Sequence, residues 1–207
     1  MKAIIFDFDG VILDSVNVKT LAFEELYSEY GLKIQQKVKN YHLLNGGISR
    51  FEKFKYFHKN FLDIDISDSQ LKSLADKFSN LVFDKVCSSK NIKGSLDFIK
   101  FASKNYLTFI CTGTPQNEIE AILEYKGLSN DFNKVFGSPK TKVAMVKEII
   151  SGYNLPNSEV LFIGDALTDF NAALETNIDF IGVKNKDTVF PKNTILVDDL
   201  NKIKKYL

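Results

Sequence analysis

The sequence has no tryptophan, a single arginine, only four prolines and two cysteines, and no long hydrophobic run. With only Cys87 and Cys111, no disulfide framework is expected, so a reducing cytoplasm is the default location. No apolar stretch approaches the ~20 residues that cross a bilayer. The first apolar run leads straight into acidic residues, which a signal peptide does not do. We therefore expect a cytoplasmic protein with no membrane partner.

A strong net charge is also missing. Lysine and arginine total 27 and aspartate and glutamate total 26, with no basic block, so no nucleic-acid partner is expected. Arg50 is the only arginine, but abundant Lys, Asn, Ile and Phe fit an AT-rich coding sequence, so this scarcity says little about any site. The 207 residues, 44% of them hydrophobic, suffice for one sizeable core, or for a core domain with a small insertion.

Hydrophobic periodicity divides the chain into a helical part and an α/β part. No strand signal appears between Ser15 and Lys93, where helical spacing predicts a helix ending near Gly31 and helices over about 49–61 and 67–86. From Gly94 onward, strands alternate with helices, which predicts a parallel sheet covered on both faces. The predicted strands are 3–6, 107–111, 135–136, 160–163, 180–183 and 195–197.

The fold class is therefore α/β, with two expected domains. Residues 1–15 and 89–207 form the core. Residues 16–88, named the helical region below, form an all-helical insertion.

The stretch from Ala3 to Ser15 carries the strongest chemical signal. Alternation along the strand places Asp7 and Asp9 on the same side, where their charges repel unless a cation lies between them. Mg²⁺, which takes oxygen ligands, suits that position. The alternative is structural, because Asp9-Gly10 between apolar runs is also typical of a β-hairpin turn.

Polar residues also follow the predicted strand 107–111. Ligands bind beyond the carboxyl ends of strands in such sheets. Thr112 and Gly113 offer a hydroxyl and a free N–H for phosphoryl oxygens at a strand-to-helix turn. Thr114 and Pro115 fit the N-cap and the first position of the next helix, which is a purely structural role.

A lysine and two further acids complete the set. Either Lys140 or Lys142 could stabilise charge on a phosphoryl oxygen, and Lys142 is preferred because it opens the following helix. Asp165 and Asp169 follow a buried strand with four-residue spacing, although acids also occur at helix N-termini because of the helix dipole. Together with the acids of the first strand, they need a divalent cation, a lysine and N–H groups before a phosphate can approach.

In this order the motifs resemble those of the haloacid dehalogenase (HAD) superfamily, and the resemblance spans the whole chain. The stretch Asp7 to Ser15 is similar to the phosphatase pattern Asp-x-Asp-Gly-x-x-x-Asp-Ser. The resemblance implies a Rossmann-like core in which Asp7 is a nucleophile that forms an aspartyl-phosphate. It implies that Asp9 is the general acid and base, and that its backbone carbonyl binds Mg²⁺.

The same resemblance implies roles for the later residues. Thr112 with Gly113, and Lys142, would bind the phosphate. Asp165 would bind Mg²⁺, and Asp169 would support the metal water or the lysine. The candidate metal set is therefore Asp7, Asp9, Asp165 and Asp169.

The helical region resembles the family's cap of the first type, a lid that closes over the site and selects the substrate. Its loop from Asn45 to Arg50 has a ligand-friendly composition, and Arg50 could bind a carboxylate or a second phosphate. The alternative is a salt bridge at a helix start, with Ser49 as N-cap. His42 and His58 are expected to pack rather than to bind a ligand.

The expected function is a cytoplasmic, Mg²⁺-dependent phosphatase, similar to phosphoglycolate phosphatases, and a monomer or weak dimer. Its expected partner is a small phosphorylated metabolite, such as a sugar phosphate or a phosphoglycolate-like compound. A β-phosphoglucomutase-type sugar phosphomutase would share the same catalytic residues but release an isomer that keeps its phosphate. A non-catalytic binding protein of the same fold is the third alternative, disfavoured because no expected acid is lost.

Overall fold

The computed structural model describes all 207 residues and contains a six-stranded, fully parallel sheet in the order β3-β2-β1-β4-β5-β6. The strands are β1 (Ala3–Phe6), β2 (Leu107–Pro115), β3 (Lys134–Ser138), β4 (Val160–Gly164), β5 (Asp179–Val183) and β6 (Ile195–Val197). In β1, Phe6 lies opposite Ile110 of β2 on one side and Ile163 of β4 on the other. The predicted α/β class is confirmed, and the hairpin interpretation of Asp9-Gly10 is wrong because both neighbours of β1 are parallel.

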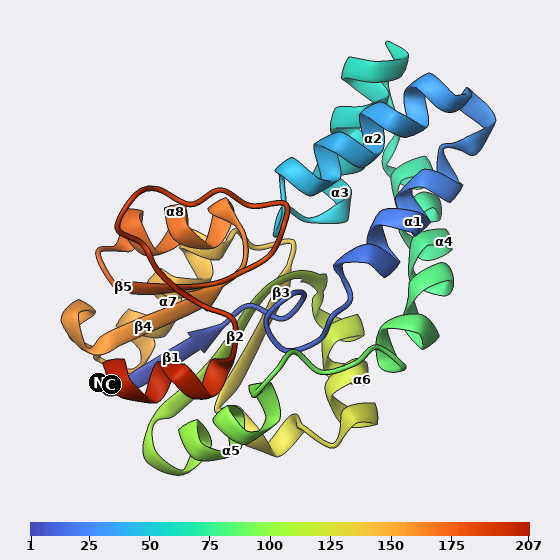
Figure 1. The fold of residues 1–207 in the computed structure, drawn as a ribbon. Helices are drawn as coiled ribbons and strands as arrows, with labels where there is room; N and C mark the ends of the chain where they lie inside the picture. The colour runs from blue at the N-terminus through green and yellow to red at the C-terminus, as the bar shows by residue number, and fades with distance from the viewer.

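Helices cover both faces of this sheet (Figure 1). They are α5 (Ser95–Asn105), α6 (Gln116–Lys126), α7 (Lys142–Gly152), α8 (Leu167–Thr176) and a closing 3₁₀ helix (Leu200–Tyr206). Alternate residues of β1 enter two different clusters: Ile4 and Phe6 join the one that includes α5, and Ile5 joins the one that includes α7. Burial on both faces explains why β1 is apolar at every position rather than at every second one.

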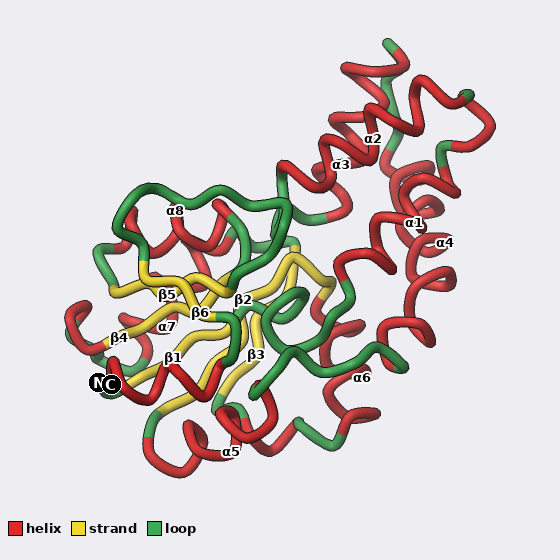
Figure 2. The backbone as a smooth tube through the Cα atoms, in the orientation of Figure 1, coloured by secondary structure: helices red, strands yellow, loops and turns green.

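Residues 16–88 contain helices but no strand, and they project away from the sheet (Figure 2). The helices are α1 (Val16–Leu26), α2 (Leu32–Leu44), α3 (Arg50–Phe57) and α4 (Asp68–Cys87), with a π-helical turn at His58–Leu62. Phe23, Phe54 and Phe78 pack against one another at their centre. Helix α2 was not predicted because its buried face consists only of Val38 and His42. The division into two domains stays a prediction.

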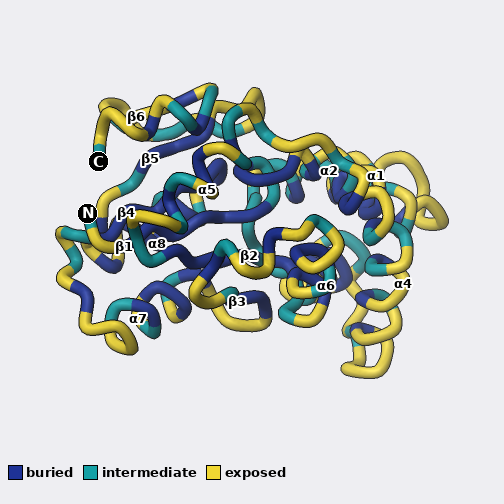
Figure 3. The backbone as a smooth tube through the Cα atoms, turned by 90° about the horizontal axis from the view of Figure 1, so that it is seen from below, coloured by how far each residue is buried: buried dark blue, intermediate teal, exposed yellow.

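Burial is concentrated on the central strands, whereas the distal turns of the helical region are exposed (Figure 3). All four residues of β1 and all five of β4 are buried. The residues that follow β1 therefore emerge from the most deeply buried part of the sheet. None of the helices combines the length and the apolarity that a membrane crossing requires.

Candidate active site

The site lies at the carboxyl ends of β1 and β4. The backbone N–H of Asp7 donates to the carbonyl of Ile163 at 2.9 Å, which continues the pairing of the two strands and brings Asp7 beside the turn that carries Asp165. The chain crosses to β2 on one side of β1 and to β4 on the other, so this edge is the topological switch point of the sheet. Ligands of open parallel sheets bind in the crevice at such a point.

Three carboxyl groups converge there. Asp7, Asp165 and Asp169 each offer an oxygen, and these oxygens lie within 4.8 Å of one another. Burial, with the charge of Asp169, raises the pKa of Asp7 to about 7. Burial, with the charge of Asp7, raises the pKa of Asp165 well above its ordinary value. One lysine does not balance the negative charge of three carboxylates. Their oxygen atoms are the ligands that a hard divalent cation such as Mg²⁺ takes.

Lys142, and not Lys140, lies in this cluster. Its Nζ is 2.7 Å from Oδ2 of Asp7 and also contacts Oδ1 of Asp169, and the residue is buried. Thr141 caps α7 by accepting the N–H of Ala144, which places Lys142 at the first helical position. Lys140 is exposed and pairs with a surface glutamate.

Asp169 both caps a helix and contacts the lysine. Its Oδ2 accepts the backbone N–H of Ala166 at 3.0 Å, which caps α8, while its Oδ1 accepts from Lys142. Both oxygens are therefore already engaged. Both oxygens of Asp7 are engaged as well, by the N–H of Phe8 and by Lys142. Asp165, whose carboxylate accepts only a 3.5 Å hydrogen bond from Asn185, is the acid with the most freedom to bind a cation.

The carboxylate of Asp9 points to a different set of partners. It accepts from Ser15 Oγ at 2.6 Å, from Lys19 Nζ at 2.5 Å and from Thr114 Oγ1 at 3.2 Å. Burial favours the neutral acid, but the ammonium of Lys19 outweighs it and holds the pKa of Asp9 below its ordinary value. The side chain of Asp9 stands apart from the three clustered acids, so only its backbone could join them in holding a cation.

Thr114 corrects one prediction. It belongs to β2, Pro115 takes the N-cap position of α6, and no side chain caps that helix. The hydroxyl of Thr114 instead accepts from Lys19 Nζ at 2.7 Å. Thr112 donates to Thr114 Oγ1 at 3.3 Å and, with Gly113, lines the cavity in front of the acids.

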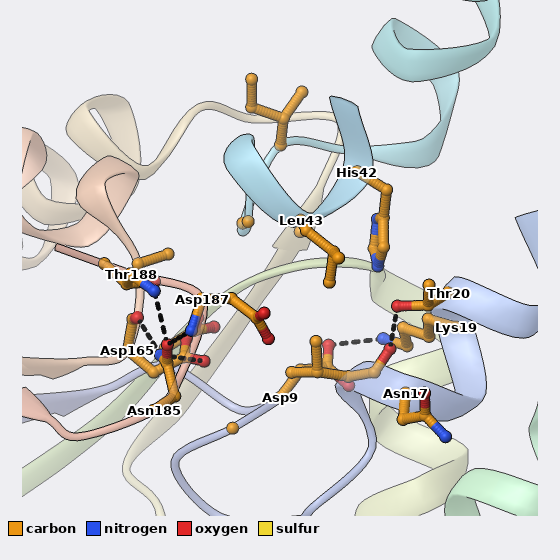
Figure 4. Close-up of a pocket in the computed structure, with 18 of the residues that line it drawn as sticks. Asp9, Asn17, Lys19, Thr20, His42, Leu43, Asp165, Asn185, Asp187 and Thr188 are labelled. Atoms are coloured by element: carbon orange, nitrogen blue, oxygen red, sulfur yellow. Dashed lines mark hydrogen bonds and ion pairs between the residues drawn. The ribbon is translucent and has the colours of Figure 1, made fainter. Parts of the chain in front are cut away.

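Sequence reasoning missed Lys19 and Asn185. Lys19 follows Ser15 by four residues, so one face of α1 carries both partners of Asp9, and that spacing was the available signal. Asn185 donates to the carbonyl of Asp165 at 2.6 Å, and its Oδ1 accepts the N–H groups of Asp187 and Thr188 (Figure 4). The loop after β5 thereby holds the turn that carries Asp165.

The acids open into a cavity of about 660 Å³ whose walls come from both the core and the helical region. In Figure 4, His42 and Leu43 approach it from the helical region, opposite Asp9 and Lys19. The loop Asn45–Ser49 contacts the core, because Thr168 Oγ1 donates to the carbonyl of Gly46 at 2.6 Å. A Cβ on Gly113 would lie 2.6 Å from the carbonyl oxygen of Gly47. This loop therefore closes tightly over the acids, and glycine is needed for that approach.

Arg50 has a partner that the sequence did not suggest. Its guanidinium donates to both carboxylate oxygens of Glu118 on α6, at 2.8 and 2.5 Å, and stacks 4.4 Å from the ring centre of Phe78. Burial favours the neutral acid, but the hydrogen bonds from Arg50 hold the pKa of Glu118 below its ordinary value. Ser49 is the N-cap of α3, as the alternative interpretation proposed. Arg50 thus ties the helical region to the core.

Replacing Arg50 by alanine is expected to destabilise the protein by about 3–5 kcal/mol, because the carboxylate of Glu118 would stay buried without its partner. Urea unfolding measures this change. The control is Lys55→Ala, which removes an exposed ion pair on the same helix and should cost less than about 1 kcal/mol. If Arg50 also binds substrate, Arg50→Ala will raise KM more than Glu118→Gln does.

Metal-free protein is expected to lose stability as the pH rises from 5 to 7.5. The pKa of Asp7 rises from 3.8 to about 7 on folding, so the folded state binds more protons in this window. Between these two pH values about 2–3 kcal/mol of stability is lost as Asp7 ionises. Chemical unfolding in EDTA at the two pH values measures it. An equal pH dependence in Asp7→Asn would contradict the assignment.

Comparison with known proteins agrees with this geometry. Residues 4–183 match the family model described as haloacid dehalogenase-like hydrolase. A phosphoglycolate phosphatase from Pasteurella multocida is 23% identical over 192 residues, which cover 88% of this chain and 85% of that protein.

Solved structures show the same fold. The β-phosphoglucomutase of Clostridium difficile has a TM-score of 0.81 and 24% identity, covering 100% of this chain and 95% of that one. A protein from Haemophilus somnus, described as a predicted phosphoglycolate phosphatase, has a TM-score of 0.77 and 18% identity, covering 100% and 97%. With its family model matched over most of its length, the chain belongs to the haloacid dehalogenase-like hydrolase family and is an enzyme of that family.

Proposed function

We propose that the protein is a Mg²⁺-dependent phosphatase that hydrolyses a small phosphomonoester through an aspartyl-phosphate on Asp7. The observation that carries this proposal is the meeting of Asp7, Lys142 and Asp165 at one end of the sheet, in front of a cavity between the core and the helical region. The relationship to a phosphoglycolate phosphatase supports the same reaction class.

The first step forms a bond between a carboxylate oxygen of Asp7 and phosphorus and breaks the bond from phosphorus to the leaving oxygen. Phe8 N–H donates to Oδ1 of Asp7 at 2.7 Å, and Lys142 contacts Oδ2, so both oxygens of the nucleophile are oriented. Lys142, at 2.7 Å from Asp7, also stands where it can stabilise charge on the transferring group. Thr112 and the N–H of Gly113 would hold the remaining phosphoryl oxygens.

Asp9 would protonate the leaving oxygen and then deprotonate the water that attacks the aspartyl-phosphate. Its pair with Lys19 keeps Asp9 ionised in the free enzyme, which suits the second role. A dianionic phosphate entering the cavity raises the pKa of a nearby carboxyl group, which favours the protonated form that the first role needs. Substrate entry therefore prepares Asp9 for the first step, and its departure as product restores the ion pair.

Asp7 and Asp165, with the backbone carbonyl of Asp9, would hold the Mg²⁺, and Asp169 would support them through Lys142. When bound, the cation offsets the charge of the buried acids and of the phosphoryl group. The YfnB protein of Bacillus subtilis, of the same fold at a TM-score of 0.70 and 19% identity, was solved bound to magnesium.

A panel of phosphorylated metabolites, assayed for phosphate release with Mg²⁺ and with EDTA, tests the proposal. We expect Mg²⁺-dependent release from one or more small phosphomonoesters and at least about a 100-fold loss in EDTA, since the cation's charge stabilisation is then missing. Full activity in EDTA would exclude the metal. Product chromatography distinguishes the alternative, because a sugar phosphomutase would convert a sugar phosphate into an isomer without releasing phosphate.

A further inference from the structure

Lys53, on α3, is a buried cation without an acidic partner. The residue is 2% exposed, it takes part in no ion pair, and its Nζ makes a single hydrogen bond, to Nδ1 of His42 at 2.8 Å. Nζ also lies 5.6 Å from the ring centre of Phe23. An ammonium group has three N–H donors, so two of them have no hydrogen-bond acceptor in the protein. A buried charge without a counter-charge is costly, and such a group is retained where a ligand supplies the missing partner.

His42 orients Lys53 but does not neutralise it. Burial and the neighbouring charge of Lys53 lower the pKa of His42 well below its ordinary value, so the ring is neutral. A neutral imidazole that accepts at Nδ1 carries its proton on Nε2, which has no hydrogen-bond partner. The ring packs on Phe23, with centroids 4.8 Å apart, which fixes its direction. His42 therefore holds Nζ of Lys53 in place while further N–H donors of Lys53 remain free to bind a ligand.

Both residues line the cavity that contains the reactive acids. The other buried bases on its walls are already paired: Lys142 with Asp7, Arg50 with Glu118, and Lys19 with Asp9. Burial and the charge of Lys19 lower the pKa of Lys53 to about 7, with Asp9 opposing, so the free residue is only partly protonated at neutral pH. An anion bound beside its Nζ would stabilise the charged form. Lys184 and Lys186 also line the cavity without an ion pair, but both are exposed to solvent. A ligand that spans the cavity from Asp7 into the helical region therefore meets Lys53 as its buried base without an acidic partner.

We propose that Lys53, oriented by His42, binds a second anionic group of the substrate, so that the enzyme selects phosphomonoesters that also carry a carboxylate or a second phosphate. This inference rests on the proposed phosphatase function. An anion completes an ion pair with the buried Lys53, whereas a substrate of the same length without the second anionic group leaves Lys53 unpaired. Selection against a substrate without the second anionic group is strong, because its binding would leave the buried Lys53 without a partner, which costs binding free energy.

Calorimetric titration tests the inference with two matched pairs of ligands, in the presence of Mg²⁺ and in an Asp7→Asn background that prevents turnover. The first pair is 2-phosphoglycolate and 2-hydroxyethyl phosphate, and the second is fructose 1,6-bisphosphate and fructose 1-phosphate. We expect the member with two anionic groups to bind at least about tenfold more tightly than its partner in one of the pairs. The pair that shows the preference identifies the second group as a carboxylate or a phosphate.

Adding Lys53→Gln should reduce that ratio to less than about threefold, because the amide can still donate to His42 Nδ1 but carries no charge. The control is Lys55→Gln on the same helix, which is exposed and should leave the ratio unchanged. The inference is overturned if the parent does not discriminate in either pair, or if Lys53→Gln weakens both members equally. Discrimination by the parent is informative even if Lys53→Gln fails to fold.

Turnover by the wild-type protein separates the two proposals. Lys53-dependent binding selectivity without phosphate release from any ligand would support the inference and contradict the phosphatase function. Phosphate release at equal rates from both members of each pair would support the phosphatase function and overturn the inference.

Discussion

Replacing Asp7 by asparagine is expected to lower kcat for phosphate release by at least about 10⁴-fold, as removal of a catalytic nucleophile does. The amide keeps the shape of the side chain but cannot attack phosphorus to form a stable acyl phosphate. Asp7 also loses its charge beside Asp165 and Asp169, so the variant should fold at least as well as the parent in EDTA. Single-turnover phosphate release and thermal unfolding measure the two effects.

The control for this experiment is Asp14→Asn. Asp14 belongs to the same sequence motif and lies on the rim of the same cavity, but its side chain is exposed and makes no hydrogen bond or ion pair. We expect kcat to change by less than about threefold in this variant, because a surface carboxyl group is lost. Wild-type turnover in Asp7→Asn would refute the nucleophile assignment, and an equal loss in both variants would point to a general effect of charge.

Replacing Lys142 by methionine is expected to lower kcat by about 10²–10³-fold, because a fixed charge is removed from the transferring group. Metal-free protein should also lose about 3 kcal/mol of stability, since Asp7 and Asp169 remain buried without their cation. Adding Mg²⁺ should then raise the melting temperature of the variant more than that of the parent. Calorimetry with and without Mg²⁺, together with steady-state kinetics, measures these changes.

Lys140→Met is the matched control, since Lys140 lies two residues away and is exposed. Loss of its surface pair with Glu148 should change stability by less than about 1 kcal/mol. The assignment of the phosphate-binding lysine reverses if Lys140→Met, rather than Lys142→Met, loses activity. Similar and small effects of both variants would show that neither lysine stabilises the reaction.

The strands and the order of the acidic motifs could be predicted because their signals are local. A run such as Ala3–Phe6 is apolar at every position because both faces of the sheet are covered, and the polar residues that follow mark its carboxyl end. Parallel topology then brings the ends of β1, β2 and β4 to one edge without further information. Helix α2 escaped prediction because few of its positions face the core, so its periodicity is weak.

The partners of individual side chains could not be predicted because they depend on how the helical region sits on the core. Thr114 has the sequence context of a helix cap, yet Lys19 from α1 approaches it across 95 positions of the chain. Arg50 ends a loop whose composition suits ligand binding, yet its guanidinium forms an ion pair with Glu118 on α6. For Thr114 a contact distant in sequence replaced the locally favoured role, and for Arg50 it supplied the partner of the salt bridge that the sequence offered as one of two alternatives.

The sequence by itself determined the parallel sheet, the all-helical nature of residues 16–88 and three of the four acids predicted to meet beyond β1 and β4, because the periodicity and the ends of strands show in adjacent residues. The fourth, Asp9, turns its carboxylate toward Lys19 instead. Only the tertiary structure decided which charges are neutralised inside the cavity: Asp9 by Lys19, Asp7 by Lys142, and Lys53 by no acid of the protein. The physical reason is that side-chain pairing around the cavity depends on distances through space, which residue spacing along the chain does not encode.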